Sequence, residues 1–112
     1  MFDDLIGKPY IDNGRGPDGY DCYGVWMEVN RRLGVEVPEQ EMILKGCKFT
    51  KVDKPQPGDA VLIITGEGPH VAAAENETTI IHTSRKIGSV HRTKMSSPQI
   101  AGRIQGFYRY VG

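Results

Sequence analysis

The stretch DCYGVWMEVNRRLG, residues 21–34, decides the expected fold because it carries the strongest periodic pattern in the chain. Asp21 is a favourable N-cap residue, and Gly34 stands where a helix commonly ends. The apolar side chains between them recur at the spacing of one helical face: Cys22, Val25, Trp26, Val29 and Leu33. The pattern therefore predicts a helix over residues 22–33 that packs one face against the rest of the protein.

The segments on either side of this helix differ in composition. Residues 7–20 are rich in Gly, Pro, Asn and Asp, which favour turns, so a loop is expected before the helix. After the helix, Pro38 and the polar residues that follow it predict a shorter second helix that ends near Lys45, before Gly46. Apolar runs between turn residues then predict strands over residues 60–65, 70–74, 78–83, 89–93 and 105–111.

Helices therefore come first and strands follow, which is typical of an α+β fold with N-terminal helices packed on an antiparallel β-sheet. The length suits a single domain, residues 1–112, that is large enough to bury one hydrophobic core. Lys plus Arg and Asp plus Glu number 14 each, so the chain lacks the basic excess of a general nucleic-acid binder. No apolar run is long enough for a membrane span, and the acidic N-terminus is not typical of a signal peptide.

Cys22 is the first candidate for chemistry, because it occupies the first turn of the expected helix directly after a Gly-rich loop. A helix N-terminus carries partial positive charge and free N–H groups, which favour a thiolate and can also bind an oxyanion. Cys22 is therefore a candidate nucleophile with a lowered pKa. On position alone, the alternative that Cys22 is a small buried core residue stays open. The second cysteine, Cys47, is expected to pack rather than to react.

Two histidines in a predicted β-hairpin supply a candidate base. A hairpin that is symmetric about Asn76 pairs Ala74 with Thr78. The same register places His70 directly opposite His82, with Cβ atoms roughly 4.5–5.5 Å apart on one face. Two imidazoles at that distance can act as a general base and the group that orients it. For either histidine alone, an exposed strand end or a bond to the backbone is the simpler alternative.

A metal site is not expected. His91 is the third histidine, but the sequence has neither the Cys-x-x-Cys nor the His-x-x-x-His spacing that zinc sites use. Asp21 is expected to cap the helix rather than to steer His70, and Asp59 is expected to lie in the turn before a strand. The chemistry of the candidate residues therefore needs no cofactor.

Several short motifs occur in order along the chain: Gly7-Lys8-Pro9-Tyr10, Gly19-Tyr20-Asp21-Cys22-Tyr23-Gly24, Pro57-Gly58-Asp59-Ala60-Val61, His70-Val71 and Ile81-His82. This ordered set resembles the NlpC-type family of bacterial and phage cell-wall cysteine peptidases. The resemblance implies a papain-like α+β fold and hydrolysis of peptide bonds in peptidoglycan stem peptides. It implies that Cys22 is the nucleophile and His70 the general base. It also implies that His82 is the third polar residue and that Tyr10 helps to shape the oxyanion site.

The sequence departs from the family pattern near the expected substrate groove. Ile11 follows Tyr10 where the family usually has an aromatic residue, and Tyr23 stands in place of a common serine. The usual Gly-Ile-Tyr run after the base is Ala72-Ala73-Ala74. These changes concern the groove more than the catalytic set.

Two other functions stay open at this point. One is an amidase or acyltransferase that uses the same thiol, and the other is a non-catalytic wall-binding or structural tail module. A chain without a leader or a wall-binding repeat resembles the small hydrolases encoded with phage tail genes, so phage tail proteins are expected partners. Such a protein is expected to be made in the cytoplasm and to act at the cell wall as part of a phage particle.

Overall fold

The structure is a computed structural model that describes residues 1–40 and 48–112. Its elements, in chain order, are η1 (Asp3–Leu5), α1 (Cys22–Arg32), β1 (Phe49–Val52), β2 (Ala60–Thr65), β3 (Gly68–Ala74), β4 (Thr79–His82), β5 (His91–Lys94), η2 (Ala101–Arg103) and β6 (Ile104–Tyr110). The elements η1 and η2 are short 3-10 helices. The expected second helix falls largely on residues 41–47, as does Cys47, and these lie outside the described residues. None of the described helices is long and apolar enough to cross a membrane.

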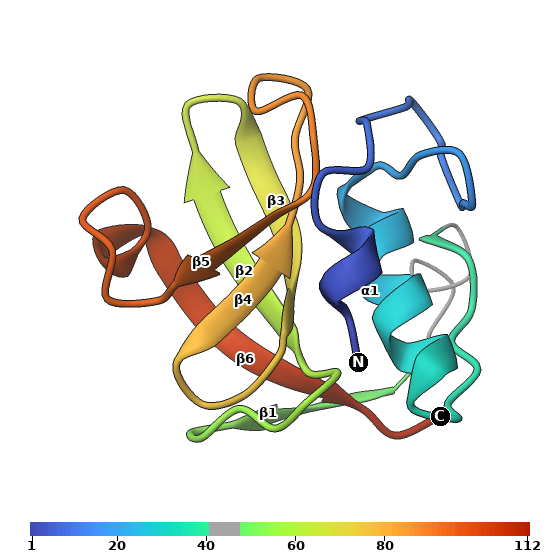
Figure 1. The fold of residues 1–112 in the computed structure, drawn as a ribbon. Helices are drawn as coiled ribbons and strands as arrows, with labels where there is room; N and C mark the ends of the chain where they lie inside the picture. The colour runs from blue at the N-terminus through green and yellow to red at the C-terminus, as the bar shows by residue number, and fades with distance from the viewer. Residues whose placement is uncertain (41–47) are drawn as a thin grey trace.

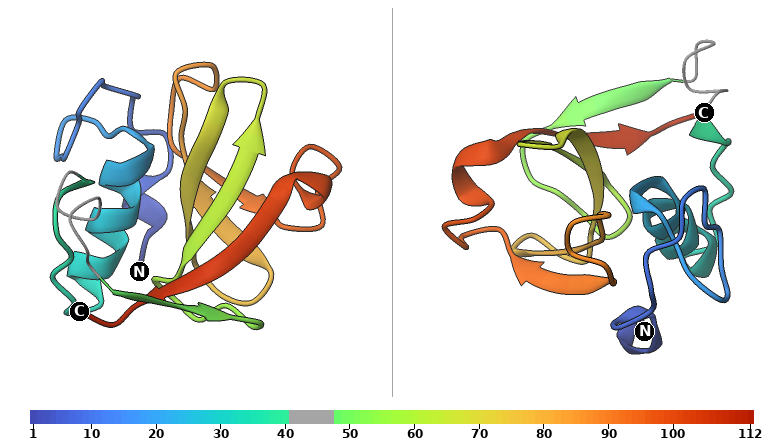
Figure 2. Two further views of the ribbon diagram at one scale, coloured as in Figure 1. Left: turned by 180° about the vertical axis from the view of Figure 1, so that it is seen from behind. Right: turned by 90° about the horizontal axis from the view of Figure 1, so that it is seen from above.

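Within the described residues, six strands form one antiparallel sheet in the order β1-β6-β2-β3-β4-β5. The helix α1 packs on one face of this sheet, against β3 and β4. Figure 1 shows the helix and the sheet as two layers, and Figure 2 shows that the sheet curls so that its other face is concave. This arrangement confirms the expected α+β fold with a helix packed on an antiparallel sheet.

The helix α1 begins where its sequence predicts and ends at Arg32, one residue before the predicted end. The side chain of Asp21 accepts a hydrogen bond from the backbone N–H of Gly24 at 2.6 Å, so Asp21 is the N-cap, as expected. At the other end, Gly34 has φ +84°, a conformation that glycine adopts without strain. Between the two ends, Trp26 is 1% exposed, and its indole N–H donates to the carbonyl of Gly58 at 2.9 Å. This bond ties the helix to the turn before β2.

The expected strands are all present, with different ends. β2 has the predicted bounds, β3 begins two residues earlier, and the ends of β4 and β5 differ from the predicted ones by one or two residues. β6 covers residues 104–110 rather than 105–111. Among the strands of the described residues, β1 alone does not match a predicted strand. It is a four-residue edge strand, half-buried at both ends and exposed between them, that pairs with β6.

Side chains of the central strands alternate between two cores, because successive residues of a strand point to opposite faces. Ala73 of β3 and Ile81 of β4 belong to the core beneath α1. Ile63 of β2, Ala72 of β3 and Ile80 of β4 belong to a second core on the concave face. The same three strands therefore serve both faces of the sheet.

The β3–β4 hairpin has a different register from the one expected. Ala74 pairs with Ile80 rather than with Thr78, so His70 and His82 are not directly opposite one another. The reason lies in the turn, where the side chain of Asn76 accepts a hydrogen bond from the backbone N–H of Thr78 at 2.9 Å. This Asx turn moves the centre of the hairpin by one residue. The resulting slip is two residues between partners, so the two histidines still lie on the same face.

Candidate active site

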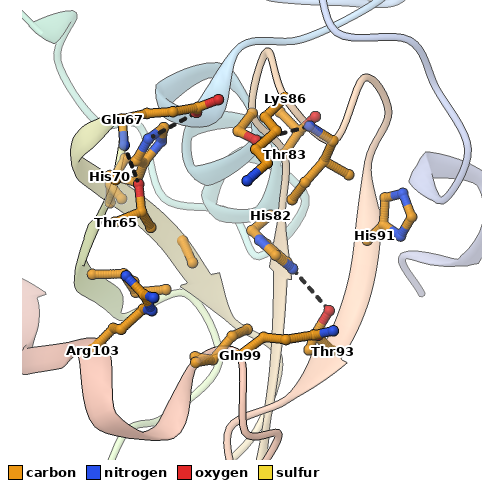
Figure 3. Close-up of a pocket in the computed structure, with 17 residues that line it drawn as sticks. Thr65, Glu67, His70, His82, Thr83, Lys86, His91, Thr93, Gln99 and Arg103 are labelled. Carbon is orange, nitrogen blue, oxygen red and sulfur yellow. Dashed lines mark hydrogen bonds and ion pairs between the residues drawn. The ribbon is translucent and has the colours of Figure 1, made fainter.

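A pocket of about 980 Å³ opens on the concave face of the sheet. All three histidines of the chain line it: His70 from β3, His82 from β4 and His91 from β5 (Figure 3). Its wall also holds Glu67 in the β2–β3 turn and Thr93 on β5. The sheet has therefore brought together side chains that are up to 26 positions apart in the sequence.

His70 contacts a carboxylate through one ring nitrogen and has nothing bonded to the other. Its Nε2 atom lies 3.3 Å from Oε2 of Glu67, with side-chain exposures of 19% and 34%. Its Nδ1 atom is buried and is without a hydrogen-bond partner among the described residues. The backbone N–H of Glu67 donates to Oγ1 of Thr65 at 3.2 Å, which holds the turn (Figure 3). A buried nitrogen without a protein partner is uncommon, and a role in chemistry is one physical explanation for it.

The ring of His82 is hydrogen-bonded to a side chain of β5. Its Nε2 atom lies 2.8 Å from Oγ1 of Thr93, and the residue is directly opposite His91 in the β4–β5 pair. Burial lowers the pKa of His82 to about 4, with smaller contributions from the neighbouring His91 and His70. The imidazole of His82 is therefore neutral at pH 7 and forms a polar but uncharged wall beside His70.

Cys22 is the first residue of α1 and is half-buried. Burial raises the pKa of its thiol, and this effect outweighs the backbone N–H groups of Val71, Tyr23 and Cys22 itself, which lower it. The expectation that the helix N-terminus lowers this pKa is therefore wrong, because desolvation of the thiolate is the larger effect. The thiol is therefore protonated at neutral pH. It lies beside the backbone N–H of Val71, the residue that follows His70 in β3. Cys22 is not among the described residues that line the pocket.

Tyr10 lies in the loop before α1, and its backbone bridges to Tyr20, two residues before Cys22. Its hydroxyl donates to Oδ1 of Asp12 at 3.1 Å, and the same oxygen accepts from Arg85 at 2.6 Å. Burial and the Asp12 carboxylate raise the pKa of Tyr10. The hydroxyl therefore keeps its proton and faces Asp12 in this structure.

Two residues of the pocket are not among the site residues that the sequence predicts. Glu67 lies in a turn three residues before His70, and Thr93 meets His82 only through the pairing of β4 with β5. The turn position of Glu67 is a weak signal by itself, since charged residues are common in turns. Asp59 is where it was expected: its carboxylate accepts from the backbone of Gln56 at 2.8 Å and also pairs with Arg109.

The described residues contain no group of three or more His, Cys, Asp and Glu side chains that is arranged to hold a metal ion. His91 instead contacts Oγ of Ser89 through its Nε2 at 3.1 Å. Each of the three histidines thus has a different neighbour at Nε2: His70 contacts Glu67, His82 contacts Thr93, and His91 contacts Ser89.

The sequence matches the NlpC/P60 family over residues 7–109. It is also 29% identical over 80 residues to the proteins named "Probable endopeptidase Rv2190c" of Mycobacterium tuberculosis and "Probable endopeptidase Mb2213c" of Mycobacterium bovis. That match covers 70% of this chain and 20% of each relative. The chain therefore spans about a fifth of the length of these curated relatives.

Solved structures share the fold. An NlpC/P60 family protein from Bacillus cereus superposes with a TM-score of 0.71 at 25% identity, covering 100% of this chain and 41% of that one. NlpC2 from Trichomonas vaginalis gives a TM-score of 0.71 at 22% identity, covering 95% and 43%. A lipoprotein-like NLP/P60 family protein from Staphylococcus aureus gives 0.69 at 21% identity, covering 96% and 38%.

Proposed function

The chain belongs to the NlpC/P60 family, and on that premise we propose that it is a cysteine peptidase that hydrolyses peptide bonds in peptidoglycan stem peptides. Its mycobacterial relatives are named probable endopeptidases, which supports peptide-bond hydrolysis. The proposed nucleophile is Cys22 and the proposed general base is His70. Association with phage tail proteins, and action at the cell wall, stay predictions.

One observation carries this proposal. The sulfur of Cys22, at the start of α1, lies by the backbone N–H of Val71, which directly follows His70 in β3. Nδ1 of His70 has no hydrogen-bond partner among residues 1–40 and 48–112, so this nitrogen is free to accept a proton. A thiol that is protonated at rest needs such a base, because only the thiolate is a good nucleophile.

The first chemical step forms an acyl-enzyme. Nδ1 of His70 accepts the proton of the Cys22 thiol, and the sulfur attacks the carbonyl carbon of the scissile amide. The C–N bond then breaks, His70 donates the proton to the leaving amine, and the acyl group stays on sulfur as a thioester. The backbone N–H of Cys22 is the proposed donor to the oxyanion. Tyr10 joins it when its hydroxyl turns away from Asp12.

The second step returns the enzyme to its starting state. Water attacks the thioester carbonyl while His70 accepts one of its protons. The carbon–sulfur bond breaks, the product leaves as a carboxylic acid, and sulfur takes the proton back from His70. His82, neutral and held by Thr93, is the proposed orienting neighbour of His70 on the same face of the sheet.

Cleavage of purified peptidoglycan fragments tests the proposal. We expect the wild type to generate new amine and carboxyl ends, detected by mass spectrometry, on diaminopimelate-type or lysine-type stem peptides. Cys22→Ala should lower cleavage by roughly 10⁴-fold or more, because the covalent route is lost. Binding of the same fragments, measured by calorimetry, should persist, since the substitution removes a single side-chain atom.

Cys47→Ala is the matched control and should keep cleavage within about twofold of the wild type, as expected for a substitution outside the chemistry. Wild-type binding without any product, on both wall types, would overturn the hydrolase proposal in favour of a wall-binding module. Transfer of the acyl group to an added amine in preference to water would instead identify an acyltransferase.

A further inference from the structure

We propose that Glu67 is a positioning residue for His70, which holds the ring so that Nδ1 is the nitrogen that accepts the thiol proton. The inference deepens the proposed function, since it rests on His70 acting as the base. It concerns a residue from the β2–β3 turn, rather than from the hairpin that carries both His70 and His82.

The geometry of the turn places this carboxylate on one specific ring atom. Oε2 of Glu67 lies 3.3 Å from Nε2 of His70, and the backbone of Glu67 is tied to Thr65 at the end of β2. Thr65 in turn pairs with Gly68 across the hairpin, and its hydroxyl donates to the Gly68 carbonyl at 3.2 Å. The carboxylate is thus held on a short, well-connected turn three residues from the histidine (Figure 3).

A carboxylate at Nε2 has a defined chemical effect on a neutral imidazole. An ionised carboxylate only accepts hydrogen bonds, so it favours the tautomer that carries the proton on Nε2. The lone pair is then on Nδ1, the buried atom for which the described part of the chain offers no hydrogen-bond partner. When Nδ1 takes the thiol proton, the ring becomes a cation, and the nearby carboxylate stabilises that charge.

The neighbouring histidine does not provide this interaction. Nε2 of His82 contacts Oγ1 of Thr93, and the ring is kept neutral by burial. A neutral ring cannot offset the positive charge that forms on His70. His82 and Glu67 therefore act differently: His82 is the neutral neighbour proposed to orient the ring of His70, whereas Glu67 decides which ring nitrogen carries the proton and balances the charge that forms.

The simplest alternative is a surface ion pair without consequence. Both side chains are partly exposed, and pairs of this kind contribute little to stability. Under that alternative, removal of Glu67 leaves both the ring proton of His70 and the turnover unchanged. The test therefore needs readouts other than stability.

The first readout is the ring proton itself, followed by nitrogen-15 NMR of the free wild-type protein and of Glu67→Ala. At neutral to mildly alkaline pH we expect the wild-type His70 ring to carry its proton on Nε2, with slow exchange against water. In Glu67→Ala this proton should exchange faster, and its signal should broaden or disappear. Glu77→Ala, which removes an exposed glutamate from the other hairpin turn, is the matched control and should leave the signal unchanged.

The second readout is turnover of stem-peptide fragments. Glu67→Ala should lower kcat about 10- to 100-fold, because the base stays in place but loses its orientation and its charge partner. KM should stay within about twofold of the wild-type value. Glu67→Gln keeps an accepting oxygen without the charge, so its kcat should fall between those of the wild type and Glu67→Ala. Melting temperatures of all variants should agree within about 2 °C, because the pair is solvent-accessible.

A wild-type proton on Nδ1 would overturn the inference, because that nitrogen could not then accept the thiol proton. An unchanged ring proton and unchanged kcat in Glu67→Ala would overturn it as well. Loss of the Nε2 proton signal in Glu67→Ala, in a protein that cleaves no stem peptide, would support the contact between Glu67 and His70 and overturn the hydrolase proposal instead.

Discussion

The two faces of the sheet use the same strands for different purposes. On the face beneath α1, Trp26, Ala73 and Ile81 are each 1% exposed or less and belong to one continuous core. On the concave face, a smaller apolar core gives way to a pocket lined by His70 and His82. Residues 70 and 73 belong to one strand, three positions apart, yet one lines a pocket and the other is sealed beneath a helix.

This difference shows how the fold separates stability from chemistry. A face that is fully covered gains free energy from apolar burial and tight packing. A face that is left partly open can hold polar groups whose bonds are incomplete, such as Nδ1 of His70. Because side chains alternate along a strand, both faces are built from β2, β3 and β4 without interfering with one another.

The largest expected effect on stability comes from shortening an isoleucine to alanine on each face of the sheet and comparing the two losses. Ile81 lies in the core beneath α1, whereas Ile63 is on the concave face and also lines the pocket. Ile81→Ala should lower the free energy of unfolding by about 4 kcal/mol, and Ile63→Ala by about 2 kcal/mol. The loss in Ile63→Ala is smaller because water from the pocket can fill the cavity that the shorter side chain leaves. Urea unfolding measures both, and equal losses would show that the concave face is packed as tightly as the other.

A smaller effect is expected from the pH dependence of His82. Its pKa is lowered from 6.5 to about 4 in the folded protein, so below pH 6.5 the unfolded chain binds a proton that the folded protein does not. Stability should therefore be fully present above pH 6.5 and fall by about 1.4 kcal/mol per pH unit toward pH 4.

The variant His82→Asn should lack this part of the slope in urea unfolding measured between about pH 7 and pH 5. His91→Asn is the control, because His91 is exposed and only neighbours His82, and it should keep most of the slope. A wild-type slope equal to that of His82→Asn would mean that His82 is freely protonated, and that the pocket is more polar than its burial indicates.

The smallest effect concerns the helix layer. Asp21 caps α1 through the N–H of Gly24 and also pairs with Arg15 at 2.7 Å. Asp21→Ala should lower the free energy of unfolding by about 1 kcal/mol, as is usual for loss of an N-cap. Asp21→Asn keeps the cap and should recover most of that loss, whereas Asp18→Ala, at an exposed site, should have no effect. If Asp21→Asn were as unstable as Asp21→Ala, the ion pair rather than the cap would be the stabilising contact.

Periodicity in the sequence was sufficient for the helix and for most of the strands. The apolar stripe from Cys22 to Leu33 and its capping residues depend on neighbours within one or two turns, so they can be recognised locally. The run at residues 60–65 became β2 for the same reason. β1 has no such signal, because a short edge strand with exposed central residues is stabilised by its pairing with β6 rather than by its own pattern.

The sequence by itself also determined the candidate residues Cys22, His70, His82 and Tyr10, since these depend on residue type and order. Only the tertiary structure decided the environment of each one. The pKa of Cys22 is raised because desolvation depends on what packs around the thiol, which no local pattern encodes. The partners of the histidines were decided in the same way, because the Asx turn at Asn76 sets the hairpin register, and strand pairing then brings Thr93 to His82.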